Sequence, residues 1–390
     1  MPKILVLDCY RHTLAVIRAL EKAGHTIILG CTQEDLSYGN VHYSKACSQT
    51  WLHSDIVDSA DKFCHELVEF LSQNTDIEAI FPVGEDSLRV ILSIHSKLPE
   101  SVTLISPEKM IVDECLDKPT SVRILESLGI TVPKSETITS QQDLEAFKSH
   151  TGLPIILKPL DSRHLLLGEK CLRITCEEEY QILMQDKSAL SSPALAQSLI
   201  EGKRHNCMFV AQDGQLLAYF ESKVIRTTKP NDTGYSVLDQ SIEPTAQHLS
   251  WCKSLVEHYH YTGIGCIQFL KDENTGKSAF LEVNPRTDAT IAIATGCGIN
   301  LPDFAVRACL GEKVTAQTDY RIGLKRHWLM GDITLTKALL LSAPGKLILQ
   351  LPSLLFHWLF ADIRTIWQPS DPGPTIAFYL DKIKRKLFRK

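Results

Sequence analysis

The stretch FLEVNPR, residues 280–286, places a carboxylate, an amide and a guanidinium at alternate positions behind an apolar segment. Side chains two residues apart in a strand point to the same face, so Glu282, Asn284 and Arg286 are expected side by side. Gln268 lies on the expected partner strand and can project beside them. Carboxylate and amide oxygens suit Mg²⁺ shared with phosphates, and an arginine suits a developing phosphoryl charge. The spacing predicts a magnesium-nucleotide site, although a solvated strand end with a surface ion pair explains it equally well.

These residues must be positioned by strands and helices, and in the N-terminal part of the chain strand and helix signals alternate. KILVLD, HTLAVIRALEKAG and HTIILGC give strand, helix and strand, and a helical segment over 59–74 precedes strands over 77–84 and 102–106. Such alternation predicts a parallel sheet covered by helices. No G-x-G-x-x-G follows the first strand. Residues 1–112 are therefore predicted to form a doubly wound α/β domain without a nicotinamide cofactor.

The pattern changes after residue 112. In ECLDKPTSVRILESLG, Asp117 and Lys118 stand before a proline, which suits the first turn of a helix. Lys158 ends the apolar strand of LPIILKP, where a surface lysine is the simpler explanation of a single cation. Hairpin turns are predicted at residues 213–214 and 274–276. These signals predict a mixed helix–sheet region that carries the polar strand end.

Five segments occur in the order and approximate spacing that is typical of one known family. They are LDKPTSVRILESLGI, PIILKP, AQSLIEG, GIGCIQFL and FLEVNPR. With the preceding α/β domain they resemble the ATP-grasp ligases, and most nearly the carbamoyl-phosphate-synthase-like branch of predicted ATP-dependent carboligases. The resemblance covers about residues 1–310. It implies a small ATP-grasp subdomain over 113–195, a large one over 196–310, and a mainly helical C-terminal extension over 311–390.

The resemblance also implies roles for individual residues. Two lysines resemble the pair that holds the ATP phosphates, a four-residue segment resembles the hinge that recognises the adenine edge through backbone groups, and three side chains resemble the magnesium ligands. In that order the residues are Lys118 and Lys158; Gln197, Ser198, Leu199 and Ile200; and Gln268, Glu282 and Asn284. Arg286 resembles the arginine that stabilises the transferred phosphoryl group or the acyl phosphate.

The segment ESKVIRTTKPNDTGYSV, residues 221–237, resembles a further hallmark of this branch, in which a lysine and an arginine precede a loop that contains Thr-Gly. Lys223 and Arg226 would then act as catalytic cations near the γ-phosphate or the substrate carboxylate. Cations that alternate along a strand and face water explain the pattern equally well. The loop is expected to be mobile, as a substrate-gating segment would be.

Three features depart from the family pattern. The glycine-rich phosphate loop expected after Lys158 is replaced by LDSRHLLLGEK, so Lys170 or Arg163 is expected to substitute for its backbone contacts, or ATP binds weakly. Gln197 stands where a glutamate is common, which recognition through backbone groups tolerates. Only Glu201 lies near the expected ribose contact, and this leaves ribose recognition in doubt.

Composition narrows the compartment and the partners. A net charge of −5 argues against a general nucleic-acid binder, and twelve cysteines without a C-x-x-C pair favour a reducing compartment. No apolar run is long enough for an integral membrane span, so a cytoplasmic location is expected. The basic end KIKRKLFRK could touch an anionic membrane, although a solvated helix end is the simpler explanation. Trp328, Trp358 and Trp367 could pack on the core or form a partner surface, and Cys297 is expected to be a small packing residue.

The sequence thus predicts a ligase that depends on ATP and Mg²⁺ (or Mn²⁺) and activates a carboxylate as an acyl phosphate for attack by an amine. Its expected partners are small-molecule carboxylate and amine substrates, and a homodimer is compatible with the sequence. Two alternatives stay open. One is an ATP-dependent carboxylase or carbamoyl-phosphate-type enzyme. The other is a nucleotide-binding regulatory protein that has lost turnover, which the glycine-poor loop supports.

Overall fold

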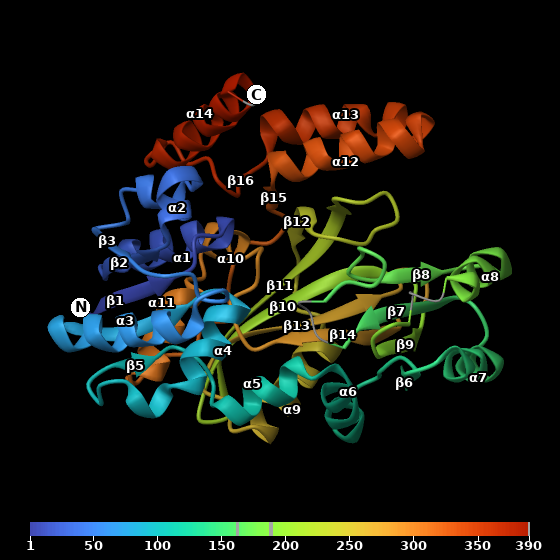
Figure 1. Cartoon of the computed structure of the whole chain (residues 1–390), viewed down its shortest axis with the longest axis horizontal. Helices are drawn as coiled ribbons and strands as arrows, with labels where there is room; N and C mark the ends of the chain where they lie inside the picture. The colour runs from blue at the N-terminus through green and yellow to red at the C-terminus, as the bar shows by residue number, and fades with distance from the viewer. Residues whose placement is uncertain (161–163, 187–189, 389–390) are drawn as a thin grey trace.

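The computed structural model of the chain describes residues 1–160, 164–186 and 190–388, with side chains as far as residue 381. Three sheets form the body of the molecule, and helices cover them (Figure 1). The N-terminal domain, in blue, lies at one end, the long strands of a large sheet cross the middle, and a small sheet lies at the other end. Within the described residues, no helix is both long and apolar enough to cross a membrane.

The N-terminal sheet is wholly parallel, with the strand order β3-β2-β1-β4-β5. Its central strands are buried because helices cover both faces, and the expected doubly wound domain is confirmed. The strands are β1 Lys3–Leu7, β2 Thr26–Cys31, β3 Gln49–Leu52, β4 Ile77–Pro82 and β5 Thr103–Leu104. The helices are α1 Arg11–Lys22, α2 Gln33–Tyr38, α3 Ala60–Gln73 and α4 Glu85–Ser93, with 3₁₀ turns at Val41–Tyr43 and His95–Lys97.

A small antiparallel sheet with the order β6-β9-β7-β8 follows two linking helices. Asp117 caps the second of these helices by accepting a hydrogen bond from the amide of Thr120 at 2.9 Å. The strands are β6 Ser135–Ile138, β7 Ile155–Pro159, β8 Leu172–Ile174 and β9 Ala194–Ser198, and the helices are α5 Lys109–Leu116, α6 Lys118–Ser127, α7 Gln141–Thr151 and α8 Glu177–Gln185. Because β9 runs to Ser198, the predicted boundary at residue 195 falls inside a strand of this sheet.

The large sheet has seven strands in the order β14-β13-β10-β11-β12-β15-β16. They are β10 Lys203–Gln212, β11 Gln215–Thr227, β12 Ser236–Ser241, β13 Gly263–Lys271, β14 Ser278–Asn284, β15 Lys325–His327 and β16 Ile363–Arg364. One face packs against α9, Ala246–His258, and the other packs against α10, Ala292–Cys297, and α11, Leu301–Cys309. The second face shares an apolar core with α1, and α1 contacts α10 and α11. The N-terminal domain therefore packs on this side of the large sheet.

The C-terminal extension is mainly helical, as predicted, with α12 Leu329–Ser342, α13 Pro344–Phe360 and α14 Gly373–Phe388. Two short strands of the extension, β15 and β16, belong to the large sheet, in which β15 pairs with β12 and β16 pairs with β15. Arg326 on β15 is fully buried and forms an ion pair with Asp239 on β12. The three helices lie along one side of the molecule, at the top of Figure 1.

Candidate functional site

Four polar side chains form a row across one face of the large sheet. In the antiparallel register Glu282 on β14 lies opposite Gln268 on β13, Gln268 lies opposite Asn206 on β10, and Asn206 lies opposite Ser222 on β11. Residues directly opposite one another in antiparallel strands share a face. We call these four residues the site row. Sequence spacing had identified only Glu282 and Gln268, because pairing with β10 and β11 is a long-range contact.

Three members of the site row carry buried polar atoms that have no hydrogen-bond partner in the described part of the chain. They are Gln268 Oε1, Asn206 Oδ1 and Ser222 Oγ. Each buried polar atom that is left without a partner lowers the free energy of unfolding by about 1–3 kcal/mol. Such a cost concentrated on neighbouring strands is typical of a place where a ligand supplies the missing partner.

The predicted metal ligands Gln268, Glu282 and Asn284 lie together at the end of the hairpin. The amide of Asn284 donates from Nδ2 to Glu282 Oε1 at 3.1 Å, and Gln268 donates from Nε2 to Asp288 Oδ2 at 3.4 Å. These contacts leave amide oxygens and a carboxylate oxygen for a cation. The set of oxygen donors, including the unpartnered Gln268 Oε1, fits Mg²⁺.

Two predicted phosphate-binding lysines lie near each other, one on α6 and one on β7 of the small sheet. Lys118, the first residue of α6, donates from Nζ to the carbonyls of Pro159 at 2.6 Å and Leu160 at 3.0 Å. Burial lowers the pKa of Lys158 on β7, while the nearby carboxylate of Glu282 raises it. Lys158 and Glu282 are therefore close enough to interact electrostatically, although they come from different sheets.

The hinge segment 197–200 leaves the end of β9. Gln197 is buried and donates from Nε2 to Ser135 Oγ at 2.9 Å, which removes its side chain from the ligand face. The amides of Ser198 and Leu199 donate to the carbonyls of Lys134 and Pro154. The backbone amide of Ile200 has no backbone partner in the described part of the chain. In this segment, Ile200 is therefore the residue whose amide could recognise the adenine edge.

The glycine-poor loop turns back on itself. Leu166 and Glu169 exchange two backbone hydrogen bonds, with Leu167 and Gly168 at φ 49° and 78° between them. Leu166 anchors the turn in the core of the small sheet. The three residues 161–163, including Arg163, lie outside the described residues.

This loop contacts the loop over residues 228–235, which the sequence predicts to be a substrate gate. Lys229 forms an ion pair with Glu169, and Lys170 lies over the ring of Tyr235 at 5.2 Å from its centroid. The two loops are thus in direct contact. Lys170 contacts the gate, and its predicted role beside the phosphates remains a prediction.

The N-terminal domain contributes residues that the sequence reasoning missed. The segment Tyr10–His12 follows β1, at the carboxyl end of a parallel strand, where ligands of such sheets commonly bind. Burial and the charges of Arg286 and Arg11 lower the pKa of His12 to about 3, so this imidazole is neutral near pH 7. Arg11 lies over the ring of Trp328 at 4.0 Å. The available signal was the run Tyr-Arg-His directly after the first strand.

Arg286 lies among these groups. Its NH1 donates to the carbonyl of Thr287 at 3.0 Å, and its Nε is buried without a partner in the described residues. Its charge influences the pKa values of both Tyr10 and His12, so Arg286, just beyond the end of β14, lies near these residues of the N-terminal domain. The structure therefore brings the arginine of the polar strand end near Tyr10 and His12.

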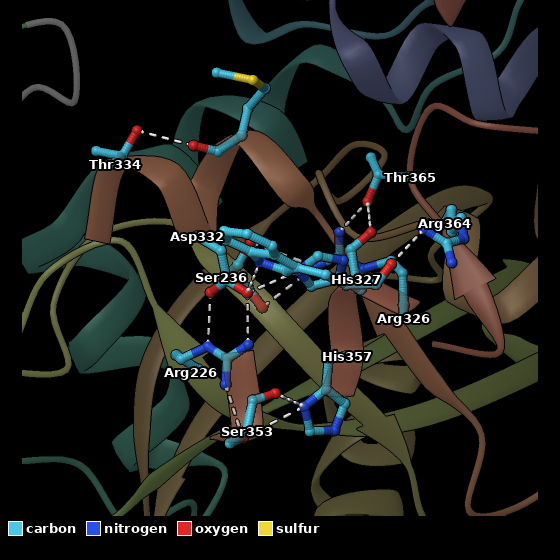
Figure 2. A network of polar contacts seen from close by, with 12 residues as sticks. Arg226, Ser236, Arg326, His327, Asp332, Thr334, Ser353, His357, Arg364 and Thr365 are labelled. Atoms are coloured by element: carbon cyan, nitrogen blue, oxygen red, sulfur yellow. Dashed lines mark hydrogen bonds and ion pairs between the residues drawn. The ribbon is translucent and has the colours of Figure 1, made fainter. Parts of the chain in front are cut away.

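The structure does not bring Lys223 and Arg226 to the site row. Lys223 follows Ser222 directly, so it points to the opposite face, where it forms an ion pair with Glu273 at 2.6 Å. Arg226 is buried and donates two hydrogen bonds to Asp332 on α12, at 2.7 and 2.6 Å (Figure 2). Both cations already have carboxylate partners in the structure, and their catalytic role remains a prediction.

A second cluster with metal-ligating residue types, His205, Glu221 and His248, lies on that opposite face. Glu221 Oε1 lies 2.8 Å from the Nδ1 atoms of both histidines, and Thr245 and Tyr219 also donate to the carboxylate. Burial alone would raise the pKa of Glu221, but the histidine hydrogen bonds lower it to about 2. Each carboxylate oxygen already has several partners, so the cluster is a structural network.

Comparison with known proteins identifies a family model and several similar proteins. Residues 200–330 match the family model described as "ATP-grasp in the biosynthetic pathway with Ter operon". The arginine-specific carbamoyl phosphate synthase large chain of Schizosaccharomyces pombe is 22% identical over 257 residues, which are 60% of this chain and 22% of that protein. The chain therefore spans less than a quarter of the length of that relative.

Two solved structures share the fold. The biotin carboxylase domain of Hydrogenobacter thermophilus 2-oxoglutarate carboxylase, in complex with MgADP, ADP and bicarbonate, superposes with a TM-score of 0.66 at 16% identity. It matches 83% of this chain and 73% of its own. N5-carboxyaminoimidazole synthetase from Staphylococcus aureus, complexed with ADP, gives a TM-score of 0.65 at 15% identity and matches 83% and 80% of the two chains.

Proposed function

The chain has an ATP-grasp fold, and we propose that it is an ATP- and magnesium-dependent ligase that activates a carboxylate for attack by an amine. One observation carries the proposal. The charge of Glu282 on the large sheet acts on Lys158 of the small sheet, and beside Glu282 lies a row of buried oxygen atoms that have no partner in the described residues. This pairing of cations with oxygen donors across two sheets suits a triphosphate held through a divalent cation.

Each group of residues would have its own task. Lys118 and Lys158 would hold phosphate oxygens, the amide of Ile200 would recognise the adenine edge, and Gln268, Glu282 and Asn284 would hold the metal. Bound magnesium would offset the negative charge that spreads over the phosphate oxygens during transfer. This chain's own residues then orient the reactants.

The substrate would enter from the N-terminal domain. Arg286 and Arg11 would attract a carboxylate there, and neutral His12 would offer a hydrogen bond without adding a competing charge. The loops joined by Lys229 and Glu169 would exclude water from the reacting groups. Exclusion of water protects an activated carboxylate from hydrolysis.

A carboxylase or carbamoyl-phosphate-type reaction is the second candidate. It is supported by the two structural neighbours described above, whose names denote a carboxylase and a carboxyamino product, and by the carbamoyl phosphate synthase relative. In that case bicarbonate would be the carboxylate that is activated. The residue roles would stay the same, so the two candidates differ in the substrate alone.

The test follows ADP release from Mg-ATP with a panel of carboxylates and amines, and with bicarbonate in a separate arm. We expect Lys158→Met and Glu282→Gln to lower kcat/KM by about 100-fold or more, because each removes a group that opposes phosphate charge or holds the metal that does so. Lys109→Met, which changes an exposed lysine paired with Asp113, is the matched control and should keep full turnover.

Three other outcomes would each be informative. Turnover with bicarbonate alone would favour the carboxylase candidate. Mg-ATP that raises the melting temperature, while no substrate gives turnover, would favour a nucleotide-binding protein without ligase activity. Full activity in both Lys158→Met and Glu282→Gln would overturn the proposed site.

A further inference from the structure

Exposed apolar side chains are concentrated on the C-terminal helices. Within the described residues, thirteen large apolar side chains are exposed between residues 340 and 380, against twelve in all the rest. Leu341 and Leu349 are 88% and 82% exposed. We call this set the outer apolar surface; its members are Leu340, Leu341, Ile348, Leu349, Leu351, Leu355, Phe356, Leu359, Phe360, Trp367, Ile376, Tyr379 and Leu380. A patch of this kind normally marks an interaction site.

Helix α13 is arranged with its polar groups inward. His357 is buried on the inner side, with its Nδ1 2.7 Å from the carbonyl of Ser353, and Trp358 donates from Nε1 to Asp332 at 3.2 Å. Figure 2 shows the Ser353 and His357 side chains close to Asp332 and Arg226. Most leucines and phenylalanines of the helix are exposed on its outside. This is the reverse of the pattern of a helix that faces water on its outer side.

The charged residues of α12 and α13 beyond Asp332 have one sign. Between Asp332 and Asp362 the sequence has no aspartate or glutamate, and its two charged residues, Lys337 and Lys346, are exposed lysines. Residues 382–390 hold six lysines and arginines and no acidic residue. Since the net charge of the whole chain is −5, residues 1–381 carry −11, which is −5 minus +6.

The helices that carry these features lie on the same side of the molecule. In Figure 1, α12 and α13 lie side by side at the top, and α14 runs along the same side to the C-terminus. Helix α13 has 17 residues with Pro352 inside it, and no helix in the described part of the chain could span a bilayer. These helices could therefore contact a membrane only by lying on its surface.

We propose that the outer apolar surface docks this protein on an anionic lipid membrane, with α12 and α13 lying in the interface and the positive charge of the sequence over 382–390 adding attraction to acidic lipids. Apolar side chains supply the insertion, and the lysines and arginines supply attraction to acidic lipids. Because residues 333–361 carry no carboxylate on a protein that is otherwise acidic, α12 and α13 would be the part turned to the lipid, whereas the more acidic faces would be repelled by it.

A second copy of the chain fits these observations less well. A two-fold dimer through the outer apolar surface would place the same patch against itself and bring two basic segments toward one interface. Like charges would then oppose the contact, whereas an anionic membrane satisfies the apolar and the cationic features together.

The test is vesicle flotation of the full chain. Vesicles of phosphatidylcholine alone are compared with vesicles that contain about a third phosphatidylglycerol, at low and high salt. We expect at least about tenfold more partitioning to the anionic vesicles, reduced by salt.

Two variants separate the apolar and the cationic contributions. Ile348→Asp with Leu349→Asp should lower partitioning at least about tenfold, since both side chains are exposed and their replacement leaves the core intact. The matched control is Val57→Asp with Ile182→Asp, two exposed apolar residues elsewhere, which should bind as the unchanged chain does. Replacing Lys384, Arg385 and Lys386 by glutamine should remove the preference for anionic lipid.

Equal melting temperatures confirm that these variants are folded. The proposal is overturned if the unchanged chain does not float with anionic vesicles, or if the Ile348/Leu349 variant floats as the control does. It is also overturned if the unchanged chain is a dimer in solution that this variant dissociates while neither binds vesicles. ATP turnover is not part of the measurement, so failure here leaves the proposed ligase site untouched.

Discussion

The site row, of which Gln268, Asn206 and Ser222 are buried, and the buried cluster around Asp332 are both polar groups on the large sheet, yet their hydrogen bonding differs. In the site row, Gln268, Asn206 and Ser222 each keep a polar atom without a partner in the described residues. Asp332 accepts hydrogen bonds from Arg226, Trp358 and the Nε2 side of His327 at 2.6 to 3.2 Å. One cluster is open to a ligand, and the other is closed by protein groups.

Hydrogen-bond partners therefore distinguish ligand-binding residues from structural residues more clearly than residue type does. Arg286 and Arg226 are both arginines on strands or strand ends of one sheet, and both resemble catalytic arginines in the sequence. Arg226 has a carboxylate partner, and Arg286 has a carbonyl partner and, in the described residues, an unpartnered Nε. A cation whose charge is already neutralised inside the protein has little left for a substrate, so the open cluster is the place for chemistry.

The largest expected effect tests the closed cluster. Asp332→Ala removes the acceptor that pairs with buried Arg226 and should lower the free energy of unfolding by about 3–5 kcal/mol, because it leaves an uncompensated charge. Urea denaturation measures this change. The exposed Asp319→Ala is the control and should stay within about 0.5 kcal/mol.

A double replacement sharpens that test. Asp332→Leu with Arg226→Met removes both charges and should recover much of the lost stability, since replacing a buried pair by apolar groups is often close to neutral. If Asp332→Ala instead leaves stability unchanged, Asp332 and Arg226 are not held as the structure shows, and the contrast with the site row fails.

The open cluster should respond in the opposite direction. Gln268→Met keeps the side-chain volume and removes the unpartnered Oε1, so the free energy of unfolding should rise by about 1 kcal/mol. Magnesium-dependent binding of ATP should weaken in the same variant, which isothermal titration with and without Mg²⁺ would detect. Gln73→Met, at an exposed position on α3, is the control for both measurements.

A loss of stability in Gln268→Met would contradict the idea that this position is kept for a ligand. It would mean that the weak hydrogen bond to Asp288, at 3.4 Å, matters more than the unpartnered oxygen. The comparison would then rest on Asn206 and Ser222 alone.

Local sequence signals predicted the elements better than the contacts between them. The hairpin that carries Gln268 and Glu282, the capped start of α6 and the parallel N-terminal sheet follow from turn residues, caps and periodicity, and the structure confirms them. Asn206 and Ser222 could not be found, because only pairing with distant strands places them beside Gln268. The burial of Arg226 also depends on α12, about a hundred residues later in the chain.

The resemblance to a known family supplied the part that periodicity could not. It indicated that Lys158 and Glu282 belong to one site, although 124 residues separate them, and their electrostatic interaction agrees with this. It also implied Lys223, which the structure places on the opposite face because a strand reverses the side of each successive residue. Ser222 lies in the site row, and its neighbour must therefore face away.

The smallest expected effect tests that last point. Lys223→Ala should change the free energy of unfolding by less than about 1 kcal/mol, since its ion pair with Glu273 is partly solvated. ADP release should stay within about twofold of the unchanged chain, in contrast to the loss expected for Lys158→Met, because Lys223 lies on the opposite face of the sheet from the site row. A large loss of turnover in Lys223→Ala, with stability unchanged, would require this lysine to reach the phosphates. The sheet would then have to present both of its faces to the substrate, which the packing of α9 against the opposite face argues against.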